Sequence, residues 1–216
     1  MTTARSLNDS SLPYKVGLAV LATAAAAGGL VIGTEWRNNP TPFPHFLRFF
    51  LRHPLVGRDK LLKALRPQRG ERLLEIGPGI GYYAVPVAAS LGEGSLHVQD
   101  VQQAMLDHTL RAARDAGVHN IHSTLRDASV IPFDDDYFDG AYLIEVIGEI
   151  PDKWAALNEL HRVIRPGGRL VVGEDLLSFD VHFMTHSSVT ELARSAGFIL
   201  EERFGTSLGY FAVFRA

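Results

Sequence analysis

The stretch LLEIGPGIGYY, residues 73–83, indicates the fold of this chain. A short apolar run ends at Ile76, glycines follow at 77, 79 and 81, and a helix is expected next. Glycine has no Cβ and accepts positive φ, so a ligand can approach this backbone closely, and the N–H groups of the following helix can face an anion. A P-loop would need Gly-Lys-Ser/Thr, and the dinucleotide fingerprint would need a glycine where Tyr82 stands. Neither pattern fits.

Short apolar runs alternate with longer amphipathic segments from about Glu71 to the C-terminus. The runs expected as strands are ERLLEI (71–76), SLHVQD (95–100), NIHSTL (120–125), FDGAYLI (138–144) and GRLVVGE (168–174). Helices are expected at 81–91, 102–116, 152–165 and 187–197. This alternation predicts an α/β layer fold with parallel strands and crossover helices.

Three local signals refine this prediction. FILEERF and GYFAVFR lie on either side of Gly205-Thr206-Ser207, which predicts an antiparallel closing hairpin. Ser188 and Glu191 have the spacing of a capping box for the last helix. Pro166-Gly167-Gly168 is a typical stop signal at a helix C-terminus.

Composition excludes several classes of protein. The chain has 216 residues, 46% of them hydrophobic, which is typical of a globular domain with a modest appendage. It has no cysteine, so zinc fingers, iron–sulfur clusters and cysteine nucleophiles are excluded. The formal net charge of -3 provides no general attraction to nucleic acid, and no nucleic-acid partner is expected.

The N-terminal region has its own composition. Residues 1–15 are expected to be a flexible N-terminus, and residues 16–33, VGLAVLATAAAAGGLVIG, carry no charge. As a helix they would span roughly 27 Å, close to the hydrocarbon thickness of a bilayer. Three interpretations remain open: a membrane-anchoring signal helix, a cleaved secretory signal, and an alanine-rich helix packed on the domain. Lys15 precedes the segment while Arg37, Arg48 and Arg52 follow it, which favours a cytoplasmic C-terminal side.

Residues 34–70 are expected to form a linker and an amphipathic lid or interfacial helix. Phenylalanines at 43, 46, 49 and 50 are interleaved with Arg48 and Arg52, a combination suited to the membrane interface. The same residues would suit a helix that caps the core or the active site. The favoured interpretation is membrane association through residues 16–52 with a cytoplasmic catalytic domain, and a soluble cytoplasmic protein is the alternative.

The motifs resemble a known family. Glu75 with Gly77, Gly79 and Gly81 resembles the first motif of the class I, Rossmann-like S-adenosylmethionine-dependent methyltransferases. The resemblance continues through LHVQDVQQAMLD (96–107), LRDASVIPF (125–133), FDGAYLIEVIGEIPD (138–152) and ELHRVIRPGGRLVVGE (159–174), and it covers residues 71–216. Arg126 departs from the glycine that is common at its position. More loosely, the domain is similar to the methyltransferases of quinone and phospholipid biosynthesis.

This resemblance implies a fold and a cofactor. The fold would be a doubly wound, mostly parallel seven-stranded sheet with an antiparallel C-terminal hairpin, preceded by the N-terminal hydrophobic helix. The glycine turn would hold the methionine and ribose parts of S-adenosylmethionine, Asp100 the ribose hydroxyls and Asp127 the adenine amino group. The residues expected to contact the cofactor are Glu75, Gly77, Pro78, Gly79, Gly81, Tyr82, Asp100, Val101, Asp127, Ala128 and Ile144.

The implied reaction is direct displacement of a methyl group onto a nucleophile of the acceptor, for which no metal is required. Glu145, Glu149 and His182, with His186, are the candidates for a general base, since all follow the fourth and fifth strands. Either glutamate could instead serve only to begin a helix. The expected partner is a small, lipophilic acceptor. The alternative function is a methyltransferase-like protein that binds the cofactor without methyl transfer or catalyses another reaction, and the glycine spacing disfavours a nicotinamide-dependent oxidoreductase.

Overall fold

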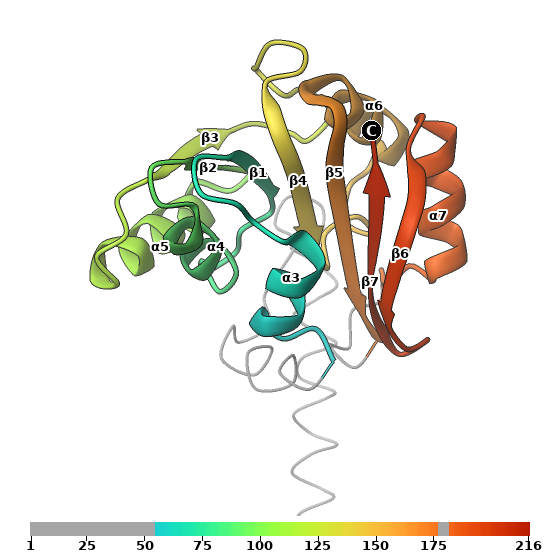
Figure 1. Ribbon diagram of the computed structural model, residues 1–216, viewed down its shortest axis with the longest axis horizontal. Coiled ribbons are helices and arrows are strands. Elements are labelled where there is room, and N and C mark those ends of the chain that lie inside the picture. Colours follow the sequence, from blue (N-terminus) through green and yellow to red (C-terminus); the bar gives the residue numbers. More distant parts are fainter. Residues whose placement is uncertain (1–54, 177–181) are drawn as a thin grey trace, which may run out of the picture. The chain divides into compact units, whose positions relative to one another are not determined.

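The computed structural model describes residues 55–176 and 182–216, and the strands in these ranges join in a seven-stranded sheet (Figure 1). The strand order is β3-β2-β1-β4-β5-β7-β6. Strands β1 to β5 run parallel, while β7 is antiparallel to both β5 and β6. The strands are β1 (Arg72–Ile76), β2 (Ser95–Asp100), β3 (Ile121–Leu125), β4 (Phe138–Ile144), β5 (Ile164–Asp175), β6 (Ile199–Gly205) and β7 (Gly209–Arg215). The helices are α3 (Arg58–Leu65), α4 (Ala84–Leu91), α5 (Gln103–Asp115), α6 (Lys153–Val163) and α7 (His186–Ser195).

Strand β1 lies at the point where the strand order reverses. It pairs with β2 on one side and with β4 on the other, so successive crossovers run in opposite directions from it. In open α/β sheets ligands bind at such a switch point, outside the carboxyl ends of the strands. Strand β4 is buried along almost its whole length, as expected for a central parallel strand. The carboxyl ends of β1 and β4 are therefore where a site is expected.

The sheet is covered by helices on both faces (Figure 1). Side chains of α3, α4 and α5 pack with Leu73 and Leu96 in one apolar cluster. Side chains of α6 and α7 pack with Leu74 and Leu170 in another. Because neighbouring residues of a strand point to opposite faces, Leu73 and Leu74 belong to different clusters. The predicted doubly wound α/β sheet is thus confirmed.

The predicted C-terminal hairpin is also confirmed. Strands β6 and β7 are antiparallel, and the N–H of Thr206 donates to the carbonyl of Gly209 at 2.8 Å in the turn between them. The predicted cap of helix α7, which precedes this hairpin, is wrong. Helix α7 begins at His186, and the hydroxyl of Thr185 accepts from the N–H of Ser188, so Ser188 lies inside the first turn.

Two other helix boundaries differ from the prediction. Helix α4 begins at Ala84 rather than at 81, because Gly81 has a φ of 83° and lies outside the right-handed helical region. Helix α6 ends at Val163 and β5 begins at Ile164, so the Pro166-Gly167-Gly168 turn falls within β5. The pairing of β4 with β5 shifts register there. The proline and glycines make an irregularity in the strand instead of ending the helix.

Helix α3 was not predicted as a separate element. Its leucines Leu61 and Leu65 are buried against the sheet, and Asp59 in its first turn suits the helix dipole. Arg169 of β5 holds its C-terminal end, because its Nε donates to the carbonyl of Leu65. The same guanidinium donates to both carboxylate oxygens of Glu71, at 2.9 and 2.6 Å. This contact joins residues that are about a hundred positions apart in the sequence.

The hydrophobic segment at 16–33 and the Phe/Arg stretch at 43–52 lie outside the described residues. The predictions made for them are untested. Among the helices of residues 55–176 and 182–216, none combines the length and the apolar content needed to span a bilayer.

Candidate functional site

The glycine turn after β1 has the positive φ values that the sequence predicts. Gly77, Gly79 and Gly81 have φ values of 69°, 57° and 83°. A Cβ at Gly77 would lie 2.4 Å from Cγ2 of Val146, and one at Gly81 would lie 3.2 Å from the Cα of Thr109. At Gly79 such an atom would meet nothing within 4 Å among the described residues. Two glycines are therefore required by packing, whereas Gly79 faces open space.

Hydrogen bonds hold this turn from three directions. The N–H of Gly77 donates to the carbonyl of Gln99 in β2 at 2.8 Å, and the N–H of Gly81 donates to the carbonyl of Pro78 at 3.0 Å. The buried hydroxyl of Thr109 in α5 donates to the carbonyl of Gly79 at 3.0 Å. Sequence reasoning missed Thr109, although it is a polar residue in the buried stripe of α5.

Glu75 lies beneath the turn and is buried. The hydroxyl of Tyr142 in β4 donates to its Oε2 at 2.9 Å. Burial raises the pKa of Glu75 from 4.5 to about 8, and the nearby Asp100 adds to the increase. Glu75 and Tyr142 therefore form a buried polar pair between the central strands.

Asp100 ends β2 beside the turn. Its Oδ1 accepts from the N–H of Gln102 at 2.8 Å, which orients the carboxylate. Partial burial raises its pKa, and hydrogen bonds from the backbone of Gln102 and Val101 oppose the increase. A carboxylate so placed can accept two hydrogen bonds from a diol at once.

The loop after β3 brings the next predicted residues to the same edge of the sheet. Oδ1 of Asp127 accepts from the backbone N–H and the hydroxyl of Ser129, at 2.8 and 2.6 Å. Asp127 is exposed, whereas Ala128 is buried. Three large apolar side chains nearby remain about half exposed: Val101 (54%), Leu125 (49%) and Val130 (52%). An exposed carboxylate beside apolar side chains suits a planar nucleobase that carries a hydrogen-bond donor.

Tyr82 and Tyr83 follow the glycine turn, and both are buried. Their rings meet edge to face with centroids 4.7 Å apart. The guanidinium of Arg58 lies 4.2 Å from the centroid of Tyr82, so one face of that ring already carries a cation. The hydroxyl of Tyr83 donates to the carbonyl of Val56 at 2.6 Å. Tyr82 thus attaches the first residue of α3 to the glycine turn, and Tyr83 attaches the segment before α3.

The segment after β4 carries two of the predicted bases. Glu145 follows the buried Ile144, is itself buried, and has a φ of 57°. A glutamate in the left-handed region costs of order 1–3 kcal/mol, and such strain clusters at functional sites. Because the next residue, Val146, packs against Gly77, Glu145 lies close to the glycine turn. Glu149 is only partly buried.

Two further acids end β5, and sequence reasoning missed them as site residues. Glu174 and Asp175 are buried, and Oε2 of Glu174 accepts from the N–H of Met184 at 3.0 Å. The N–H of Glu145 donates to the carbonyl of Gly173 at 2.7 Å, which joins the two strand ends. The signal was present in the sequence, since two acids directly follow the segment RLVVG of β5, residues 169–173.

The candidate bases His182 and His186 have different surroundings near the carboxyl ends of the strands. His182 is exposed, and its main chain lies against Gly148, where a Cβ would be 1.9 Å from the carbonyl oxygen of His182. His186 begins α7 and packs edge-on against Tyr210, with centroids 5.3 Å apart. Burial and the nearby Arg203 lower the pKa of His186. Within the described ranges no three His, Asp or Glu side chains are grouped to hold a metal ion.

Apolar side chains accompany these acids. Val146, Phe183 and Met184 are partly buried and pack against the core. Leu176 and Leu208 are exposed, and the N–H of Leu176 donates to the carbonyl of Leu208 at 2.8 Å. We call these five residues the apolar rim. The carboxyl ends of β4 and β5 therefore combine buried acids with an apolar rim.

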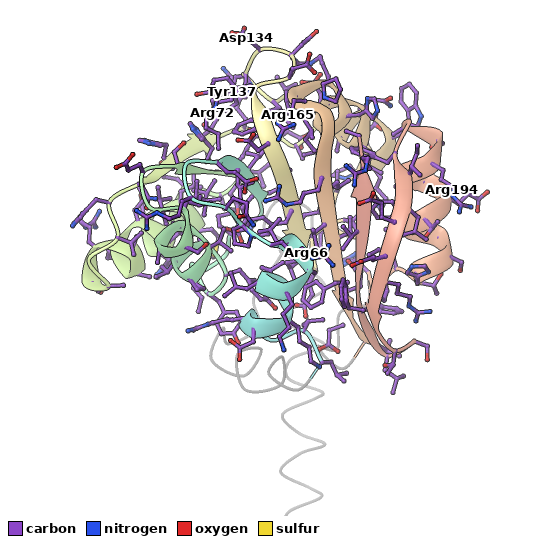
Figure 2. All side chains as sticks on the ribbon, viewed as in Figure 1. Arg66, Arg72, Asp134, Tyr137, Arg165 and Arg194 are labelled. Atoms are coloured by element: carbon purple, nitrogen blue, oxygen red, sulfur yellow. The ribbon has the colours of Figure 1, made fainter. Side chains whose placement is uncertain are left out.

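The opposite edge of the sheet is built differently. Figure 2 shows Arg72, Asp134, Tyr137 and Arg165 together there, and the guanidinium of Arg72 lies 4.4 Å from the centroid of Tyr137. A cavity of about 340 Å³ also lies at this edge, lined by Asp135, Asp136, His161, Arg162, Ile164, Pro166 and Ala216. None of the predicted site residues lines it. The cavity is therefore separate from the candidate site.

Comparison with known proteins agrees with this geometry. Residues 74–172 match the family described as "Methyltransferase domain". Residues 74–172, just under half of the chain, are thus similar to a methyltransferase domain. The match spans β1 to β5 and includes the glycine turn, Asp100 and Asp127.

Curated relatives are similar over part of this chain. The "Ubiquinone/menaquinone biosynthesis C-methyltransferase UbiE" of Vibrio vulnificus (strain YJ016) is 36% identical over 107 residues, which are 49% of this chain and 41% of that protein. The protein of the same name from Coxiella burnetii is 32% identical over 119 residues, 54% of this chain and 48% of that protein. The chain thus spans less than half the length of these relatives.

Solved structures share the fold of the domain. A SAM-dependent methyltransferase from Aquifex aeolicus has a TM-score of 0.68 and 20% identity, covering 80% of this chain and 98% of that one. The [4+2]-cyclase SpnF has a TM-score of 0.61 and 24% identity, covering 78% and 64%. Since a cyclase shares this fold, the reaction has to be argued from the site.

Proposed function

We propose that this protein is an S-adenosylmethionine-dependent methyltransferase that acts by direct displacement on a small, lipophilic acceptor. The observation that carries the proposal is the glycine turn, where Gly79 faces open space next to the oriented carboxylate of Asp100. Asp100 would accept from the ribose hydroxyls and Asp127 from the adenine amino group. Val101 and Ala128 would contact the base. The residues present therefore fit the cofactor.

The chain's own residues would perform the remaining chemistry. When bound, the cofactor supplies a methyl group that its positively charged sulfur has activated. The protein has to align the acceptor, exclude water and take up a proton. We assign proton uptake to Glu145, because it is buried, strained and close to the glycine turn. Glu149 and His182 are the other candidate bases. The apolar rim would exclude water from the acceptor.

Two observations support a lipophilic acceptor. The rim beside Glu145 is apolar. Relatives with 32–36% identity are named as C-methyltransferases of ubiquinone and menaquinone biosynthesis. A nucleophilic carbon of an electron-rich ring, which loses its proton when it is methylated, is the acceptor that this combination favours, with a lipophilic tail along the rim.

A lipophilic acceptor agrees with the proposed location of the enzyme. The uncharged segment at 16–33 and the Phe/Arg stretch at 43–52 support membrane association, with the catalytic domain on the cytoplasmic side. A soluble cytoplasmic enzyme is the alternative. Fractionation of the full chain without detergent distinguishes them, since recovery entirely in the soluble fraction would contradict membrane association.

The proposed activity is tested with the full chain in two steps. Calorimetric titration with S-adenosylmethionine, S-adenosylhomocysteine and NAD should show binding of the first two only. Transfer of a labelled methyl group is then measured with alkylated hydroquinones of increasing tail length, and kcat/KM should rise with the tail. A preference for NAD would overturn the assignment. Cofactor binding without transfer to any acceptor would favour a protein that uses the cofactor for another purpose.

Gly79 provides a specific prediction for cofactor binding. In Gly79→Ala the new methyl group would enter the space assigned to the cofactor, so affinity for S-adenosylhomocysteine should fall at least about tenfold, measured by calorimetry. Gly117→Ala is the matched control, because Gly117 has a φ of 70° and no atom of the described chain near its Cβ position. Both variants should lose about 1–2 kcal/mol of stability from backbone strain. Equal affinities in the two variants would place the cofactor elsewhere.

A further inference from the structure

Gln99 connects two parts of the candidate site through a single buried side chain. It lies in β2 immediately before Asp100, and its side chain is 1% exposed. Nε2 donates to the carbonyl of Asp127 at 2.9 Å and to that of Val130 at 3.2 Å. The N–H of Val130 donates to the same carbonyl of Asp127 at 3.0 Å. The amide therefore holds both ends of the turn formed by residues 127–130.

The orientation of this amide follows from its neighbours. Both partners of Nε2 are carbonyl oxygens, which only accept hydrogen bonds, so the nitrogen has to face them. Oε1 is buried and has no hydrogen-bond partner among the described residues. A carboxylate at this position would direct one of its oxygens at both carbonyl oxygens, and acceptors repel one another. The turn therefore requires a hydrogen-bond donor at residue 99. A side chain of suitable size alone is not enough.

The main chain of Gln99 holds the other part of the site. Its carbonyl accepts from the N–H of Gly77 at 2.8 Å, at the start of the glycine turn. One residue thus supports the glycine turn through its backbone and the 127–130 turn through its side chain. Only the side-chain contact changes when residue 99 is replaced by a residue of the same size.

The 127–130 turn determines the position of the Asp127 carboxylate. Both hydrogen bonds from Ser129 go to Oδ1, at 2.8 and 2.6 Å, and they tie the carboxylate to the turn. The half-exposed Val101, Leu125 and Val130 lie at the same edge of the sheet. Apolar side chains can pack on the faces of a flat base, but only polar groups at its edge distinguish one base from another. A carboxylate accepts hydrogen bonds, so it selects a base with an exocyclic amino group.

We propose that Gln99 is a positioning residue that sets the selectivity of the site for a 6-aminopurine over a 6-oxopurine, by holding the turn that carries Asp127. The inference rests on the proposed function, because the base belongs to S-adenosylmethionine. Gln99 touches no part of the cofactor and acts through Asp127.

The test uses two ligands that differ only at this edge of the base. S-adenosylhomocysteine has the 6-amino group, and S-inosylhomocysteine has an oxygen in its place. For the unaltered chain the dissociation constant should be at least about tenfold higher for the inosine compound, because it loses the hydrogen bond from the 6-amino group to the charged Asp127. In Gln99→Glu this ratio should fall about tenfold, toward one. Gln99→Met, which removes the donor without adding charge, should also lower the ratio.

Asn120 offers a matched control for the loss of a bridging amide. Its Nδ2 donates to the carbonyls of Ala88 and Gly94, both at 2.9 Å, at the amino end of the sheet. Asn120→Asp should lower the melting temperature as Gln99→Glu does, while it leaves the ligand ratio unchanged. A ratio in both Gln99 variants equal to that of the unaltered chain would overturn the inference and leave the proposed function intact. Failure of the unaltered chain to bind S-adenosylhomocysteine would overturn the proposed function as well.

Discussion

Replacing Glu145 by glutamine is expected to lower kcat by about 10²–10⁴-fold, the usual contribution of a general base. Glutamine has the same size and can remain in the buried position, but it cannot take up a proton. The affinity for S-adenosylhomocysteine should stay within about twofold, because the glycine turn and Asp100 are unchanged. The measurement is labelled methyl transfer to the best alkylated hydroquinone, combined with calorimetry of cofactor binding.

Glu149→Gln and His182→Ala are the controls for this prediction. Both residues lie near the same edge of the sheet, but Glu149 is only partly buried and His182 is exposed. Each should retain kcat within about threefold, since neither would hold the proton. A large loss of kcat in one of these variants, with Glu145→Gln active, would transfer the role of base to that residue.

Replacing Glu75 by glutamine is expected to stabilise the fold at alkaline pH by roughly 3–5 kcal/mol. Burial raises the pKa of Glu75 from 4.5 to about 8 in the folded protein. Between these pH values the folded chain keeps a proton that the unfolded chain has lost. The free energy of unfolding of the unaltered protein therefore falls as pH rises from about 4.5 to 8, and this contribution is constant above that window.

Urea unfolding at several pH values measures this effect. In Glu75→Gln the fall in stability between pH 4.5 and 8 should be smaller, because the variant has no proton to lose at this position. The hydrogen bond from Tyr142 lowers the pKa of Glu75, so Tyr142→Phe should extend the fall to higher pH. Parallel stability curves for Glu75→Gln and the unaltered protein would show that Glu75 is ionised at neutral pH in the fold.

Much of the fold could be predicted because its determinants are local. The alternation of apolar runs and amphipathic segments indicates strands and helices within a window of a few residues. The predicted strands 95–100 and 138–144 coincide with β2 and β4. One boundary that was wrong depends on a distant partner. The C-terminal end of α6 is set where Ile164 begins to pair with Phe138 of β4.

The candidate site could be predicted in part for the same reason. Gly77, Gly79 and Gly81 are recognisable because positive φ restricts the residue type at each position. Gln99 and Thr109 give no comparable signal, since an amide or a hydroxyl occurs in many settings. Their partners lie about thirty residues away, at Asp127 and Gly79. Only the folded chain brings those atoms within hydrogen-bond distance.

The sequence by itself determined the α/β alternation, the closing hairpin and the glycine turn with Asp100, because backbone conformation and side-chain periodicity are properties of neighbouring residues. Tertiary structure alone decided which acids are buried, which strand ends meet and which amide supports the 127–130 turn. These features depend on pairing between strands and packing between layers, which join residues that are far apart in the chain. Burial then changes the chemistry of a side chain such as Glu75, whose raised pKa no local pattern reveals.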